Sequence, residues 1–107
     1  MRKTAGTAGR KGGRGSVLSL PADLGIESAH ELHAALAARV GDAAPVTVDG
    51  SAVSRVHAAS IQLLLMFFRD RRGAGRETAW RQASDTLSSA AALLGVARSI
   101  QLSEVNP

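Results

Sequence analysis

The sequence predicts an α/β domain in which helices cover a small mixed, partly parallel β-sheet. Short apolar stretches rich in β-branched residues alternate with longer stretches of helical periodicity, in the order β-α-β-α-β-α. A helix between consecutive strands favours parallel pairing of those strands. The chain has 107 residues, of which 45% are apolar, so it has room for one domain with one modest core.

Two strands and one helix are predicted in the first half of the chain. Residues 16–20 (SVLSL) alternate between polar and apolar and predict a strand that ends at Pro21. A helix is predicted from about Ser28 to Gly41, because apolar residues recur at helical spacing. These residues are Ile26, Ala29, Leu32, Leu36 and Val40. The second strand is predicted at Val46–Val48.

The longest apolar run of the sequence predicts a buried helix over about residues 58–72. The strand before this helix is predicted to end at Asp49-Gly50. Between that strand and the helix, Val53 and Val56 are predicted to point toward the core. One stripe of the helix consists of Ile61, Leu64, Leu65 and Phe68, and a second apolar group consists of Leu63, Met66 and Phe67. A helix that is apolar on most of its circumference is expected to pack on the sheet and on something else besides.

The last part of the chain predicts one short strand and one more helix. The strand is expected around Thr78–Trp80. The helix is expected to be capped by Ser84 or Asp85 and to end at Gly95. Its inward-facing residues are predicted to be Leu87, Ala91 and Leu94. Residues Ser99–Leu102 are expected to form a short helix or another strand.

The net charge of +4 is concentrated at the N-terminus. Residues 1–15 carry five basic side chains and no acidic one, whereas the remaining chain carries eight basic and nine acidic side chains. A segment of mainly Gly, Ala, Thr, Arg and Lys buries too little apolar surface to order itself. We therefore predict a disordered basic tail at residues 1–15 and a single domain at residues 16–107. The tail is expected to be simply solvated; weak attraction to nucleic acid or an anionic membrane is the alternative.

The sequence lacks the motifs of several enzyme and cofactor classes. It has no cysteine, which excludes disulfides and thiolate metal sites and favours a cytoplasmic location. No glycine-rich phosphate loop follows a strand, and no apolar run approaches the roughly 20 residues that cross a bilayer. His30 and His33 share a helix face but lack further ligands, so no metal site is predicted. His57 and Ser60 lack an orienting acid and an oxyanion hole, so no catalytic residue and no cofactor is predicted.

Two features of the sequence have two interpretations each. Trp80, the only tryptophan, is either an anchor that faces a partner or a cover for the edge of the core. A basic cluster at the end of the long helix is either solvated, as we expect, or faces a partner of complementary charge. The cluster consists of Arg69, Arg71, Arg72 and Arg76.

The order and spacing of these segments resemble the STAS domain. This is the fold of anti-sigma factor antagonists and of the small STAS subunits of bacterial lipid-transport ABC systems. The resemblance runs from about Val17 to Leu102 and is carried by three stretches: LSLPADLGIESAHELHAAL, PVTVDGSAVSRVHAASIQLLLMFF and AWRQASDTLSSAAALLGV. Short STAS proteins encoded beside bacterial chemotaxis genes are similar, particularly in SIQLLL and in the tryptophan strand.

The resemblance places the function at the elbow between a strand and the apolar helix. STAS proteins usually carry Asp-Ser/Thr-Ser/Ala-Gly there, and a partner kinase phosphorylates the hydroxyl residue in the sigma-factor switches. Here His57 stands at the acidic position, Ala58 and Ala59 follow, and Ser60 stands at the glycine position. The usual acceptor positions lack a hydroxyl, so the usual phosphorylation is not expected, and Ser60 in the first helical turn is the remaining candidate.

The resemblance thus implies a non-catalytic regulatory module that binds a signalling partner, either an anti-sigma or histidine kinase-type protein or a chemotaxis-type complex. The partner-binding residues predicted on the elbow and helix are Val56, His57, Ala58, Ala59, Ser60, Gln62 and Met66. The alternative is an MlaB-like regulatory subunit of a phospholipid-transport ABC ATPase. A homodimer through the apolar surface at Leu63, Met66 and Phe67 is a further alternative, and no membrane insertion is expected.

Overall fold

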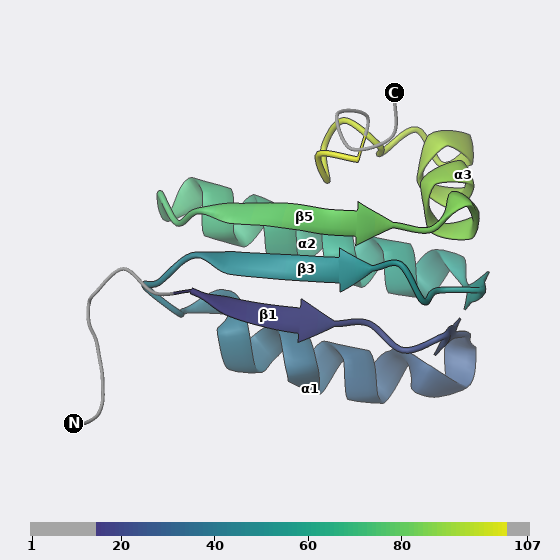
Figure 1. Ribbon diagram of the computed structural model, residues 1–107, viewed down its shortest axis with the longest axis horizontal. Helices are drawn as coiled ribbons and strands as arrows, with labels where there is room; N and C mark the ends of the chain where they lie inside the picture. The colour runs from purple at the N-terminus through teal and green to yellow at the C-terminus, as the bar shows by residue number, and fades with distance from the viewer. Residues whose placement is uncertain (1–14, 103–107) are drawn as a thin grey trace.

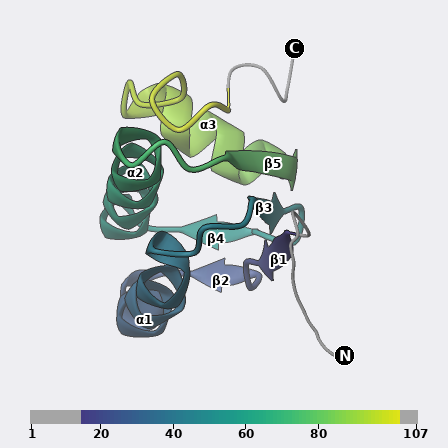
Figure 2. The same ribbon diagram turned by 90° about the vertical axis from the view of Figure 1, so that its left-hand side faces the viewer.

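The computed structural model describes residues 15–102, in which helices lie over a parallel sheet (Figure 1). β1 (Ser16–Ser19), β3 (Val46–Gly50) and β5 (Thr78–Ala83) form the sheet in the order β1-β3-β5. Both strand pairs are parallel. α1 (Ala29–Val40) and α2 (Ala58–Gly73) lie on the same side of this sheet, as Figure 2 shows. The predicted α/β fold is confirmed.

Two very short strands extend the carboxyl ends of the sheet. β2 (Asp23–Leu24) and β4 (Arg55–Val56) pair in parallel as a separate two-stranded sheet. A 3-10 turn, η1 (Ile26–Ser28), then leads into α1. Neither strand is predictable from the sequence, because two residues are too few to show the alternation that identifies a strand. β4 leads directly into α2, and its pairing with β2 holds the chain in place just before the helix begins.

The core lies between the sheet and the helices and follows the predicted periodicity, except at Ile26, which lies in η1 and is 52% exposed. Val46 and Val48 point inward from β3, and Leu32 and Leu36 point inward from α1. The predicted α2 positions Ile61, Leu64 and Phe68 are all buried, and Leu65 is partly buried. Burying large apolar side chains is the main favourable contribution to folding, on the order of 2 kcal/mol for each.

The second apolar group of α2 packs mostly against α1. Phe67 is buried, Leu63 is partly buried against the core, and only Met66 stays exposed, at 53%. Helix α1 is therefore the additional packing partner that the apolar circumference of α2 predicted. The apolar surface available for a homodimer is smaller than the sequence analysis expected, because Phe67 is not part of it.

Trp80 belongs to the core. Its side chain is 8% exposed and its ring stacks on Phe68, with 5.4 Å between the ring centroids and 11° between the planes. Its indole N–H donates to the backbone oxygen of Ile100 at 2.6 Å. The interpretation of Trp80 as a cover for the core is confirmed, and the interpretation as a partner-facing anchor is wrong.

The chain after β5 differs from the prediction in two places. α3 (Asp85–Leu93) is capped by Ser84 and followed by Gly95 at φ +73°, as expected, but Leu94 is 44% exposed rather than inward-facing. Leu94 is the C-terminal cap of α3, where the helical periodicity no longer sets the direction of a side chain. Residues 99–102 form neither a helix nor a strand but a turn that buries Ile100 and Leu102.

The predicted basic tail, except for Gly15, lies outside the described residues, as do residues 103–107. Within residues 15–102, no helix combines the length and apolar character that crossing a membrane requires.

Candidate partner-binding surface

The elbow (Val56–Ser60) is held in place by β2. The register of β2 and β4 places Leu24 opposite Val56, and the His57 amide donates to the backbone oxygen of Leu24 at 2.9 Å. Val56 is half-buried, whereas His57 and Ala58 are exposed. The two-residue strands therefore fix the backbone of the elbow and leave its first helical residues at the surface.

His57 is the N-cap of α2. Its backbone is extended, and its Nδ1 accepts a hydrogen bond from the Ala59 amide at 3.0 Å. The first amides of a helix lack intrahelical partners, so a side-chain acceptor at this position stabilises the helix start. An imidazole accepts through Nδ1 only while that nitrogen carries no proton. His57 thus has a structural role at the position where the resemblance expects an acidic residue.

Ser60 is enclosed in the core. Its side chain is fully buried, and its hydroxyl donates to the backbone oxygen of Leu24 at 2.8 Å. This bond ties the first turn of α2 to β2. Both roles predicted for Ser60, the partner contact and the phosphorylation, need an accessible hydroxyl. In this structure the Ser60 hydroxyl is not accessible. We therefore leave Ser60 out of the surface proposed below.

The other predicted contact residues on α2 share one outward-facing stripe. Ala58, Gln62 and Met66 are exposed, and Ala59 between them is half-buried. Apart from the imidazole of His57, no titratable side chain occurs between Arg55 and Arg69. Ala58, Gln62 and Met66 thus follow one another at helical spacing on an exposed face of α2, whereas Val56 packs partly against the core. This exposed face is small and carries no formal charge.

Charged side chains border the elbow on one side. Arg55 pairs with Asp23 at 3.2 Å and approaches Glu27 at 3.9 Å, and all three side chains are more than half exposed. The second oxygen of this carboxylate, Asp23 Oδ1, accepts the Gly25 amide at 2.8 Å. No sequence pattern predicts this group, because 32 residues separate Asp23 from Arg55.

The end of α3 adds exposed apolar side chains that sequence reasoning missed. Leu93 is 88% exposed and Leu94 is 44% exposed. No charged residue occurs between Asp85 and Arg98. As an element, α3 contacts α2 and β4, the short strand that leads into the elbow. The signal in the sequence is the uncharged run TLSSAAALLGVA, whose length leaves apolar residues beyond those that the helix buries.

The basic cluster is not one surface. Arg71 is fully buried, whereas Arg69 and Arg72 are exposed and Arg76 is half-buried. Burial lowers the pKa of Arg71, and the nearby charge of Asp42 opposes this shift. Arg72 and Arg76 donate to the backbone oxygens of Ser99 and Gly41. The interpretation as a solvated helix end is therefore correct only for part of the cluster.

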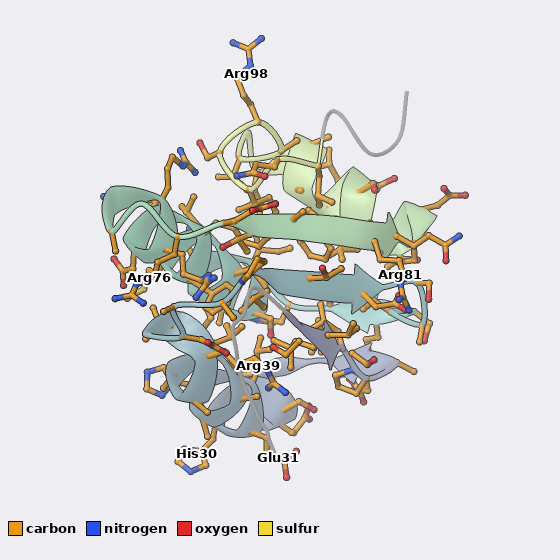
Figure 3. All side chains as sticks on the ribbon, turned by 60° about the vertical axis from the view of Figure 1, so that its left-hand side comes forward. His30, Glu31, Arg39, Arg76, Arg81 and Arg98 are labelled. Atoms are coloured by element: carbon orange, nitrogen blue, oxygen red, sulfur yellow. The ribbon has the colours of Figure 1, made fainter. Side chains whose placement is uncertain are left out.

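The two histidines of α1 lie on the exposed surface of the helix. In Figure 3 His30 points away from the body of the molecule, as does Glu31 beside it. Among residues 15–102, no group of three or more His, Cys, Asp or Glu side chains is placed to hold a metal ion.

Comparison with known proteins gives one result. The family model described as the MlaB STAS domain matches residues 8–104, which is nearly the whole chain. No curated protein matches the chain closely enough to serve as a relative. The matched segment contains the parallel sheet, the helices that cover it and the elbow. The chain therefore belongs to the STAS domain family.

Proposed function

We propose that this protein is a non-catalytic regulatory module that binds a signalling protein through the elbow and the outward-facing stripe of α2. STAS domains are in general non-catalytic regulatory modules that bind protein partners. The proposed contact residues are Val56, His57, Ala58, Ala59, Gln62 and Met66. The observation that supports the proposal is the uncharged, exposed stripe that begins at the α2 N-cap.

The elbow favours recognition that does not depend on phosphorylation. Ala58 and Ala59 carry no hydroxyl, and the Ser60 hydroxyl is buried and hydrogen-bonded. A partner would therefore recognise the shape and the apolar character of the surface. Met66 is the largest exposed apolar side chain on the stripe, and methionine adapts well to partner surfaces.

Two partner classes fit this surface. The first is a kinase or chemotaxis-type signalling complex, as the resemblance to anti-sigma factor antagonists implies. The second is the ATPase of a phospholipid-transport ABC system, and the match to the MlaB-type model fits this class without favouring it over the first. In both cases the protein would act as the regulatory subunit.

The test inserts a charge into the proposed interface. Ala58→Arg places a guanidinium at an exposed position of the elbow, and Ala38→Arg makes the same change at an exposed position of α1. Binding of the purified kinase and of the purified ATPase would be measured by calorimetry. We expect Ala58→Arg to weaken binding of the true partner at least about tenfold, because an unpaired charge in a desolvated contact is costly. Ala38→Arg should bind within about twofold of the wild type.

A second pair of changes separates the partner classes. The double variant His57→Asp with Ala58→Ser restores the acidic position and the first hydroxyl position of the usual STAS elbow. If the partner is a kinase, this variant should incorporate phosphate while the wild type does not. Unchanged binding of both candidate partners by Ala58→Arg would overturn the proposed surface.

A further inference from the structure

We infer that the outer edge of β1 and the groove beside it bind an extended segment of a partner protein, which joins the sheet as a further strand. β1 stands at one end of the strand order β1-β3-β5, so within residues 15–102 it pairs with β3 alone. In Figure 1 α1 lies past β1, on the side away from β3, and Figure 2 shows the same offset. α1 is therefore placed where it can support a strand added next to β1.

The backbone of β1 directs hydrogen-bonding groups away from the sheet. The amides of Ser16 and Leu20 donate to backbone oxygens on the β3 side, at 3.0 and 2.9 Å. Successive residues of a parallel strand direct their backbone groups to opposite sides. Val17 and Ser19 therefore each direct one N–H and one C=O to the outer edge. An extended peptide is the ligand that pairs with such a row of donors and acceptors.

The two edges of the sheet differ in their protection. Beyond β5 lies the turn at residues 99–102, as Figure 1 shows, and the oxygen of Ile100 there accepts the indole N–H of Trp80. β5 also carries Arg81, whereas β1 (SVLS) contains no charged residue and no proline. Charges and prolines on an edge strand discourage pairing with other chains. Within the described part of the chain, β1 thus has an edge that accepts another strand.

A groove of about 200 Å³ lies between the edge of β1 and α1. This volume is several times the roughly 30 Å³ that one water molecule takes up in the liquid. Side chains of a strand alternate between its two faces, so every second residue of an added strand would face α1 and the groove. Large apolar residues at alternate positions would fit there. The apolar lining consists of Leu18, Leu20, Pro21, Leu24, Leu32 and Ala35.

The groove has one charged side chain at its rim. Glu31 is exposed and is the one charged residue of the lining, which also contains Ser19 and Ser28. Within residues 15–102, Glu31 takes part in neither of the ion pairs, which join Arg55 to other carboxylates. A Lys or Arg that faces α1 would pair with Glu31. The expected segment therefore combines apolar residues with a basic residue at alternate positions.

The chain itself does not supply such a segment. Residues 1–14 are basic, but they include four glycines and Met1 as their one large apolar residue, so they cannot fill the groove. The β1 of a second copy carries no basic residue for Glu31. Continuing the sheet through two β1 strands with the helices on one face would also crowd the two α1 helices. Neighbouring strands lie about 4.8 Å apart, whereas packed helices need about 8–10 Å.

The experiment measures amide hydrogen exchange of the full chain by NMR, with and without the peptide TKTLTLTKT. This peptide presents leucines and lysines at alternate positions and reads the same in both directions. With excess peptide, exchange of the Val17 and Ser19 amides should slow at least about tenfold, because they gain acceptors. Exchange of the Leu20 amide, which already donates to Asp49, should change little.

A charge reversal tests the role of Glu31. The wild type should bind TKTLTLTKT at least about threefold more tightly than TETLTLTET at low salt, and Glu31→Lys should reverse this preference. Glu77→Lys makes the same change of net charge at an exposed position outside the groove and should keep the wild-type preference. Ala58→Arg, on the proposed elbow surface, should bind the peptide within about twofold of the wild type, so the two proposals can fail separately.

Three results would overturn the inference. The first is a wild type that binds neither peptide at about 1 mM, and the second is a Glu31→Lys variant that keeps the wild-type preference. The third is slow exchange of the Val17 and Ser19 amides without peptide. Slow exchange that is independent of protein concentration would assign the edge to the chain's own N-terminal segment. Slow exchange that increases with concentration would assign it to a second copy.

Discussion

At the scale of single residues, Arg71 is the most heavily bonded side chain among residues 15–102. Its guanidinium is fully buried and uses its five N–H groups for five hydrogen bonds of 2.5–3.1 Å. The acceptors are the hydroxyl of Thr78 and the backbone oxygens of Arg39, Asp42, Ala44 and Glu77. These groups come from the end of α1, the loop before β3 and the start of β5. One side chain therefore joins three segments that meet at the amino ends of the strands.

Arg71→Lys should destabilise the fold strongly. An ammonium has three N–H donors at one point and cannot reproduce the planar fork, so at least two buried backbone oxygens would lose their donors. Each such loss costs roughly 1–3 kcal/mol, and we expect the free energy of unfolding to fall by about 3 kcal/mol. Urea unfolding would measure this. Arg69→Lys on the exposed side of the same helix should change stability by less than about 0.5 kcal/mol. A similar small effect for Arg71→Lys would contradict the proposed role of the buried network.

At the scale of elements, the start of α2 combines stability with the proposed function. His57 caps the helix from outside, and Ser60 fastens its first turn to β2 from inside. Both bonds use side chains at the elbow, the segment in which STAS proteins usually carry the phosphorylated residue. These two bonds hold the backbone of the elbow from both sides of the helix.

His57→Ala should lower the free energy of unfolding by about 1 kcal/mol, because the Ala59 amide loses its acceptor. His57→Asn should keep most of the stability, since asparagine is among the best N-cap residues. Ser84 caps α3 through the Leu87 amide at 3.1 Å, so Ser84→Ala provides a matched cap deletion of similar size. Urea unfolding of the three variants tests this. Equal stabilities of His57→Ala and His57→Asn would show that the imidazole does not act as a cap.

The sequence predicted the features that depend on neighbouring residues and did not predict those that depend on residues far apart in the chain. Helices, caps and the three main strands depend on neighbours in the sequence, so periodicity identified them. Arg71 and its acceptors Arg39 and Asp42, by contrast, lie 32 and 29 residues apart, and Asp23 and Arg55 lie 32 residues apart. Such pairs depend on the packed fold. The elbow was located from the resemblance, but the burial of Ser60 depends on β2, which is too short to recognise.

At the scale of the whole molecule, the basic side chains are concentrated in the N-terminal segment that precedes the proposed domain. The first 15 residues carry five of the 13 basic side chains and no acidic one, whereas the remaining chain is nearly neutral. The family model nevertheless matches from residue 8, so the match includes part of this basic segment. The boundary of the domain, which we propose at residue 16, is therefore the point that needs a direct measurement.

Two deletions of the N-terminus locate this boundary. Removal of residues 1–7 leaves the whole family match, and removal of residues 1–14 leaves only the part of the chain that the structure describes. If the domain begins at residue 16, both deletions should change the free energy of unfolding by less than about 0.5 kcal/mol, because they remove no packed side chain. The longer deletion should also reduce any binding to an anionic vesicle or to DNA at low salt, since it removes five basic residues. A loss of stability for the longer deletion alone would move the boundary of the domain to residue 8.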